Sequence, residues 1–165
     1  MMNKKIYLPI ILSFLALAVN AQVSYGELTF GSYNMKINLV TENDSIFLHV
    51  IYSDESRNLS DDPKLLLRLM DDTILSFDGK NLGRHSKSDG GVVIRGFLIE
   101  SGYVVSEAKF PVSKDQIILF KKGIKKLRLN TSPNYHEKKW RKDKIGKILY
   151  KAYLNSSPNS FEDGF

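Results

Sequence analysis

Basic residues are concentrated in one stretch of the chain, and their type and spacing define the clearest chemistry in the sequence. Residues 114–151 hold 13 lysines and arginines against 3 acidic residues, a net charge of +10, whereas residues 22–113 hold 9 against 13. A cationic segment attracts anions, and aromatic rings among the lysines can stack on sugars or lie at a bilayer interface. The sequence therefore predicts a surface for an anionic partner, formed by Lys138, Trp140, Lys144, Lys147 and Lys151.

Three kinds of partner fit such a surface: an anionic glycan, a lipid headgroup and an acidic protein surface. The alternative is a solvated face whose lysines keep a sheet edge soluble. Nucleic acid is not a predicted partner, because the export signal described below takes the protein out of the cytoplasm.

Catalytic chemistry has no comparable signal in the sequence. The chain has no cysteine and no Gly-x-Ser-x-Gly turn for a nucleophilic serine, and His49, His85 and His136 have no spacing that groups them. Adjacent acids such as Asp54 and Glu55 lack the spacing and the glycine of a calcium loop. We therefore predict no catalytic, metal-binding or cofactor-binding residue. A non-enzymatic binding or scaffolding domain is favoured, with a small hydrolase and an inhibitor or immunity-type protein as alternatives.

Two short stretches offer a further kind of site. Asp44-Ser45-Ile46 and Asp72-Thr73-Ile74 resemble the O-glycosylation acceptor motif of exported bacterial proteins. They make Ser45 and Thr73 candidates for modification.

A helix predicted over residues 135–154 would position the basic surface. At 100° per residue, Lys144, Lys147 and Lys151 fall on one side, and Trp140 projects onto that same side. The opposite side is an apolar stripe that should dock on a sheet, formed by Ile145, Ile148, Leu149, Ala152 and Tyr153.

A shorter helix is predicted from Ser113 to Gly123. Ser113 and Gln116 have the spacing of a capping box, in which each side chain accepts a hydrogen bond from the other residue's backbone N–H. Gly123 can adopt a left-handed conformation that ends the helix.

The remaining elements are predicted strands, because apolar and β-branched residues alternate between turn residues. Short turns between them favour antiparallel neighbours, with tight hairpins at Asp71-Asp72 and Ser101-Gly102 and a further turn over 88–91. The predicted strands cover residues 23–30, 35–40, 45–53, 64–70, 73–77, 92–99, 103–112 and 124–130.

Residues 1–21 read as a cleavable signal peptide. Lys4 and Lys5 precede an uncharged apolar run, and Val19-Asn20-Ala21 places small residues where signal peptidase requires them. Without a cysteine there is no site for lipid modification, so we expect a soluble periplasmic or secreted protein with no transmembrane segment after cleavage.

The C-terminal half resembles small exported proteins of gut Gram-negative bacteria, whose function is not known. The resemblance rests on three stretches: Phe110-Pro-Val-Ser-Lys-Asp-Gln-Ile, Gly123-Ile-Lys-Lys-Leu-Arg-Leu and Lys142-Asp-Lys-Ile-Gly-Lys-Ile-Leu-Tyr-Lys. These motifs are structural, cover about a third of the chain and imply no functional residue.

Together the elements predict one β-rich domain over residues 22–154 with a loose tail over 155–165. Its fold class would be an antiparallel β-sandwich or strongly curved sheet, with a short helix before the last strand and a C-terminal helix docked on the sheet.

Overall fold

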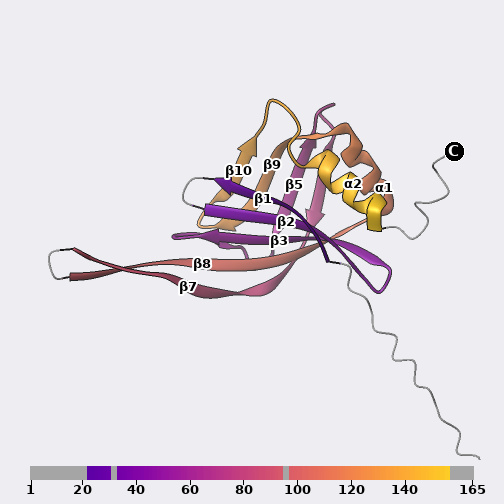
Figure 1. The fold of residues 1–165 in the computed structure, drawn as a ribbon. Coiled ribbons are helices and arrows are strands. Elements are labelled where there is room, and N and C mark those ends of the chain that lie inside the picture. The colour runs from indigo at the N-terminus through magenta and orange to yellow at the C-terminus, as the bar shows by residue number, and fades with distance from the viewer. Residues whose placement is uncertain (1–21, 31–32, 95–96, 157–165) are drawn as a thin grey trace, which may run out of the picture.

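The protein is built from two antiparallel sheets, as the strand pattern predicts. The computed structural model describes residues 22–30, 33–94 and 97–156. The first sheet curls into a half-barrel (Figure 1). Its strand order is β1 (Gln22–Phe30), β2 (Tyr33–Glu42), β3 (Ser45–Asp54), β8 (Phe97–Val112) and β7 (Lys80–Ile94).

The second sheet carries the middle of the basic stretch, residues 124–139. Its order is β10 (Tyr135–Lys139), β9 (Ile124–Ser132), β5 (Lys64–Leu69) and β6 (Ile74–Asp78), and the two-residue strand β4 (Asn58–Leu59) pairs with the end of β9. Helix α1 (Lys114–Leu119) and the 3-10 turn η1 (Phe120–Lys122) connect β8 to β9, and helix α2 (Gly146–Ser156) follows β10. Among the described residues, no helix has the length and apolar character needed to cross a membrane.

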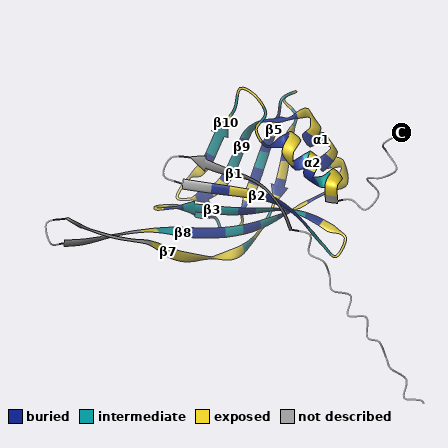
Figure 2. Cartoon of the chain, viewed as in Figure 1, coloured by how far each residue is buried: buried dark blue, intermediate teal, exposed yellow. Residues whose placement is uncertain are grey.

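Period-two burial explains how the sheets form one core. In β3, every second residue from Ile46 to Asp54 is buried, and in β5 Leu65, Leu67 and Leu69 are buried while their neighbours are not. The buried hydrophobic side chains of both sheets and of the helices form a single cluster. Figure 2 colours the buried residues dark blue on strands and helices alike. The helix residues Ile117, Leu149 and Ala152 are also buried. Helix α2 thus docks as predicted, except that Ile148 of the expected stripe is 45 % exposed.

The junction between η1, β9 and α2 contains the residues of the three resembling stretches. The predicted capping box is confirmed, since Ser113 Oγ accepts from Gln116 N–H at 3.2 Å and Gln116 Oε1 accepts from Ser113 N–H at 2.9 Å. Gly123 ends the helical segment, although at φ 81° and ψ 154° it is extended with positive φ rather than left-handed helical. A Cβ on Gly146 would lie 2.9 Å from the backbone N of Ile124.

Asp143 connects the same elements through its carboxylate. It accepts backbone N–H bonds from Ile124 at 2.9 Å, Ile145 at 3.2 Å, Gly146 at 2.8 Å and Lys147 at 2.8 Å. Burial acts to raise the pKa of Asp143, but these four donors outweigh it and hold the pKa below the ordinary 3.8. Asp143 therefore caps α2 and fixes it to the start of β9.

The predicted helix over 135–154 is wrong in its first half. Tyr135–Lys139 forms strand β10, antiparallel to β9, and α2 begins only at Gly146 and ends at Ser156, two residues beyond the predicted end. Only His136 of this strand is buried, while Tyr135 and Lys139 are exposed, and all five residues pair with β9. Cross-strand pairing with β9 thus prevails over the helix propensity of the lysines and Glu137.

The turns predicted at 88–91 and at Ser101-Gly102 are also wrong. Both stretches lie inside long strands, where Ser88 pairs with Gly102 and Gly91 with Glu100, and an irregularity between Ser88 and Gly91 absorbs the extra residues. The hairpin predicted at Asp71-Asp72 is confirmed by the pairing of β5 with β6.

Strands β7 and β8 continue beyond the first sheet as a two-stranded ribbon (Figure 1). Strand β3 pairs with β8 as far as the Asp54–Val104 pair, whereas β7 pairs with β8 out to Ile94 and Phe97. The predicted signal peptide over 1–21 and the tail beyond Ser156 lie outside the described residues.

Candidate functional site

Cationic side chains gather on the outer face of the second sheet. In the strand register, Arg68 of β5 lies opposite Lys126 of β9, and Lys126 lies opposite Lys139 of β10. Arg128, two residues along β9, shares the face of Lys126 because side chains of a strand alternate. The pairing of β5 with β9 skips Lys125, and such a bulge can direct a side chain away from the regular alternation. The basic face is defined here as Arg68, Lys125, Lys126, Arg128 and Lys139.

A shallow groove runs across this face. One hollow of about 190 Å³ is lined by Arg68, Lys125, Lys126, Lys139 and Trp140. An adjoining hollow of about 120 Å³ shares Arg68 and Lys126 and has a more apolar lining. Its other lining residues are Leu66, Leu67, Ile74 and Arg128.

A hydrogen bond to the neighbouring strand β9 holds Trp140 at one end of the groove. Its backbone N–H donates to the carbonyl of Lys125 at 2.7 Å, and its half-buried side chain packs against the core. The indole therefore presents a fixed wall beside Lys125, Lys126 and Lys139.

Two carboxylates organise the cations of the basic face. Glu137 Oε2 accepts from Lys126 Nζ at 2.8 Å and from Arg128 Nη2 and Nε at 2.7 and 2.9 Å, and Lys139 Nζ lies 3.5 Å from Glu137 Oε1. Asp72 Oδ1 lies 2.6 Å from Lys125 Nζ and 3.7 Å from Arg68 Nη1. Five cations thus share two carboxylates, and the face keeps an excess of three positive charges.

The charges shift the titration of Glu137. Hydrogen bonds from Lys126, and then from Arg128, lower the pKa of Glu137 to about 2. The Arg128 guanidinium is also fixed from its other side, 4.4 Å from the centre of the Tyr135 ring. The basic face is therefore an ordered array at neutral pH.

The structure places the five predicted surface residues on different elements. Lys138 is half-buried on β10 and, by strand alternation, lies on the opposite side from Glu137 and Lys139. Trp140 follows β10 and does not belong to a helix, whereas Lys144 precedes α2. Lys147 and Lys151 are exposed on α2. Trp140 therefore neighbours the lysines of β9 and β10 in the groove.

Sequence reasoning missed Arg68 and Glu137 as members of this face. Arg68 lies 58 positions before Lys126 in the sequence, so only the strand register reveals their proximity. The spacing of Glu137 and Lys139 was a usable signal, because they are two residues apart, as neighbours on one strand face must be.

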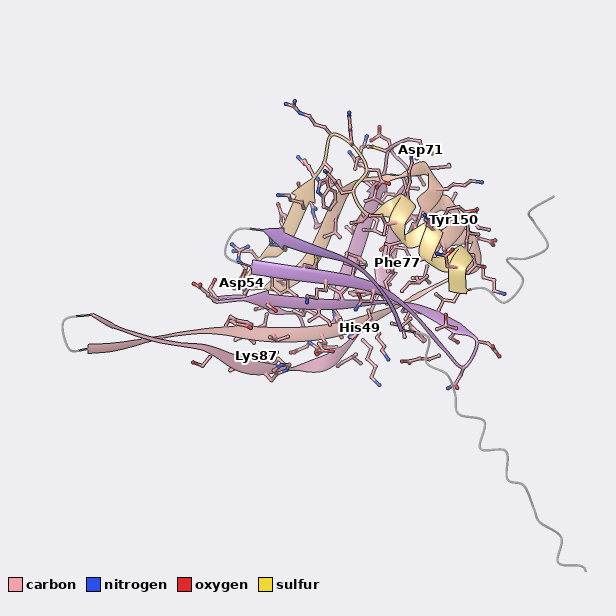
Figure 3. The ribbon with its side chains drawn as sticks, viewed as in Figure 1. His49, Asp54, Asp71, Phe77, Lys87 and Tyr150 are labelled. Atoms are coloured by element: carbon pink, nitrogen blue, oxygen red, sulfur yellow. The ribbon has the colours of Figure 1, made fainter. Side chains whose placement is uncertain are left out.

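A second surface lies on the first sheet, where Figure 3 labels His49 and Lys87 away from Asp71 of the β5–β6 turn. His49 Nε2 and Glu107 Oε2 are 3.0 Å apart. Glu107 also lines a groove of about 300 Å³, so His49 and His85 are closer in space than their spacing implied. The groove is further lined by Lys36, Ile51, Ser53, His85, Lys87, Tyr103 and Val105.

His136 and the acidic residue Asp54 are both buried, and their contacts are ones that stabilise the fold. Asp54 is buried and accepts hydrogen bonds from the Tyr52 hydroxyl at 2.8 Å, from Ser56 N–H at 2.8 Å and from Arg57 N–H at 3.1 Å. The buried His136 ring lies 5.8 Å from that of Tyr52. Within the described part of the chain, no three acidic or histidine side chains converge closely enough to share a metal ion.

The two candidate modification residues lie at hairpin turns. Ser45 is exposed at the start of β3, directly after the positive-φ residues Asn43 and Asp44. Thr73 is half-buried in the β5–β6 turn, and its N–H donates to Asp71 Oδ1 at 3.1 Å.

Comparison with known proteins places the chain in no established group. No protein-family model matches it, and neither curated proteins nor solved structures give a significant match.

Proposed function

We propose that the protein is a non-enzymatic binding domain of the bacterial envelope whose basic face binds an acidic polysaccharide. The observation that carries this proposal is the groove, in which Arg68, Lys126 and Lys139 from three neighbouring strands line up beside Trp140.

Charge supports an anionic partner. The basic face has five cations and two carboxylates within reach of one another, and an exposed excess of positive charge raises the local concentration of anions. A linear polymer with repeated charges could meet several of these cations at once.

The aromatic and apolar residues favour a glycan among anionic partners. Trp140 forms one wall of the groove, and Ile74 is 57 % exposed at the adjoining hollow. The face of an indole ring is large, rigid and apolar, so it can cover the C–H face of a sugar while the lysines bind its acidic groups. A lipid surface also uses aromatic residues, but those insert into the bilayer, whereas Trp140 is half-buried against the core.

The proposal that the protein acts in the envelope requires export, for which the support is the signal peptide pattern of residues 1–21. Edman sequencing of the protein secreted by its host should begin at Gln22. Recovery of a chain beginning at Met1 would contradict export.

Binding is tested with purified protein starting at Gln22 and three polymers: polygalacturonate, dextran sulfate and neutral dextran. We expect binding to the acidic polymers to fall at least tenfold between 50 and 200 mM salt, because exposed charges are screened over about 10 Å at 0.1 M, and we expect no binding to dextran. No binding to either acidic polymer at 50 mM salt refutes the proposal. Tighter binding to anionic lipid vesicles than to the polymers would favour a lipid partner instead.

Two matched triple variants locate the surface. The first replaces Arg68, Lys126 and Lys139 with Gln. The second replaces Lys144, Lys147 and Lys151 with Gln, which removes the same charge from the region of the predicted helix face. Loss of binding only in the first supports the groove, whereas loss only in the second would restore the helix face as the binding surface.

A small hydrolase remains the second candidate because of one observation, the His49–Glu107 pair beside the 300 Å³ groove. A carboxylate that orients a histidine is a frequent part of a general base. Hydrolysis of any envelope polymer that is abolished by His49→Ala, but unchanged in the first triple variant, would favour this candidate.

A further inference from the structure

The surroundings of Glu137 define a site for an anionic oxygen. Three N–H donors converge on Glu137 Oε2 within 2.7–2.9 Å, namely Lys126 Nζ, Arg128 Nη2 and Arg128 Nε. Charge-assisted contacts of this length are among the stronger hydrogen bonds in proteins. The donors come from β9 and the acceptor from β10, so the carboxylate is held across two strands.

We propose that Glu137 is an internal competitor, which occupies the anion site in the free protein and gives way to a carboxylate of the bound polysaccharide. This inference rests on the proposed function of the basic face. It identifies the chemical group that is recognised, a carboxylate, and the residue that limits its affinity.

Geometry makes the exchange feasible. The Glu137 side chain is 21 % exposed and that of Lys139 is 70 % exposed, so the site opens to solvent. Lys126 also lines both hollows of the groove, and Arg128 lines one of them. An incoming carboxylate can therefore approach the same nitrogens that now bind Glu137, while the longer contact to Lys139 separates first.

Electrostatics gives the direction of the effect. In the free protein, Glu137 reduces the positive charge that three neighbouring cations present to a ligand. Removing its charge frees those cations without changing the backbone. The site is open to solvent, and at the dielectric constant of water one unit charge about 5 Å from the ligand changes affinity on the order of fivefold at low salt.

The test compares Glu137→Gln with a matched control, Glu107→Gln. Both substitutions remove one carboxylate that contacts a basic side chain, but Glu107 lies on the first sheet beside His49. Binding to polygalacturonate at 50 mM salt is measured by isothermal titration calorimetry. Urea unfolding of each variant, followed by the fluorescence of the single tryptophan, confirms that it is folded.

We expect Glu137→Gln to bind polygalacturonate about fivefold more tightly than the wild type, and Glu107→Gln to change affinity by less than twofold. A second variant, Asp72→Asn, frees Lys125 and Arg68 in the same groove and should shift affinity in the same direction. If Glu137→Gln fails to fold, Glu137→Asp takes its place: the shorter carboxylate loosens the contacts to Lys126 and Arg128 and should also raise affinity, and unchanged binding then overturns the role of Glu137.

The outcomes separate this inference from the proposed function. Wild-type binding with no gain, or a loss, in Glu137→Gln overturns the role of Glu137 and leaves the binding surface intact. An equal gain in Glu107→Gln also overturns it, because net charge would then explain the effect. No binding by the wild type or by any variant overturns both.

Discussion

Replacing Gly123 with Ala should destabilise the fold strongly, because two independent costs meet at this position. At φ 81° and ψ 154° the backbone is in a region that is almost confined to glycine, which costs about 1–3 kcal/mol for another residue. A Cβ would also lie 2.9 Å from Asp143 Cβ and 3.2 Å from Met70 Cγ, so neighbouring side chains must move. We expect a total loss of about 2–4 kcal/mol, a large part of the 5–15 kcal/mol typical of a domain.

Three other glycines separate the two costs. Gly83 has φ 124° and nothing within 4 Å of a Cβ, so its Ala variant reports backbone strain alone. A Cβ on Gly146 would lie 2.9 Å from Ile124 N and from Phe120 O, which tests crowding without positive φ. Gly102 has neither feature, with its nearest contact at 3.4 Å, and its Ala variant should be neutral or slightly stabilising.

Urea unfolding followed by tryptophan fluorescence measures all four variants. With a urea dependence of about 1–3 kcal/mol per molar, the Gly123→Ala midpoint should fall by about 1–2 M relative to Gly102→Ala. Equal midpoints for these two variants would refute the assignment of Gly123 as a strained helix stop.

Two further predictions concern titratable groups. Asp143→Ala should lower the free energy of unfolding at pH 7 by about 2 kcal/mol, since four backbone donors lose their acceptor, and Asp143→Asn should cost less; equal losses would contradict capping by the carboxylate. Burial, and then the charge of Arg57, lowers the pKa of His136 below 6.5, so the unfolded chain takes up a proton that the folded protein resists. The free energy of unfolding is therefore retained above pH 6.5 and declines as the pH falls through 6.5 toward the folded-state pKa of His136. Urea unfolding at pH 7.5 and pH 5.5 measures this decline, which should be smaller in His136→Gln than in His85→Gln. The same decline in both variants would exclude His136 as the cause.

The sequence predicts best the elements whose signals are local. The capping box of Ser113 and Gln116 involves residues three positions apart, and the alternation in β3 and β5 follows from one buried side per strand. Residues 135–139 were misassigned because lysines and a glutamate favour a helix locally, whereas pairing with β9 decides their conformation.

The charge composition predicts that a basic surface exists, but it does not predict which residues form it. Charge counts along the chain identify residues 114–151, yet Arg68 joins the face only through the register of β5 with β9. A helix over residues 135–154 predicts that Trp140 lies beside Lys144, Lys147 and Lys151. Because residues 135–139 form a strand instead, Trp140 lies beside Arg68, Lys126 and Lys139. Reading strand partners, rather than helix faces, would have placed Trp140 correctly.

The β7–β8 ribbon makes the molecule longer than its globular body alone. Beyond the last β3 partner, the β8 side of the ribbon runs over seven residues, from Tyr103 back to Phe97, which at about 3.3 Å per residue gives an arm of roughly 23 Å. A globular domain of this length has a radius of gyration of about 14–15 Å and therefore a diameter of roughly 37 Å, so the arm is more than half as long as the body is wide. In solution the protein should scatter X-rays and tumble as an elongated particle. A partner bound along the outer part of the arm would lie about two nanometres from the body of the protein.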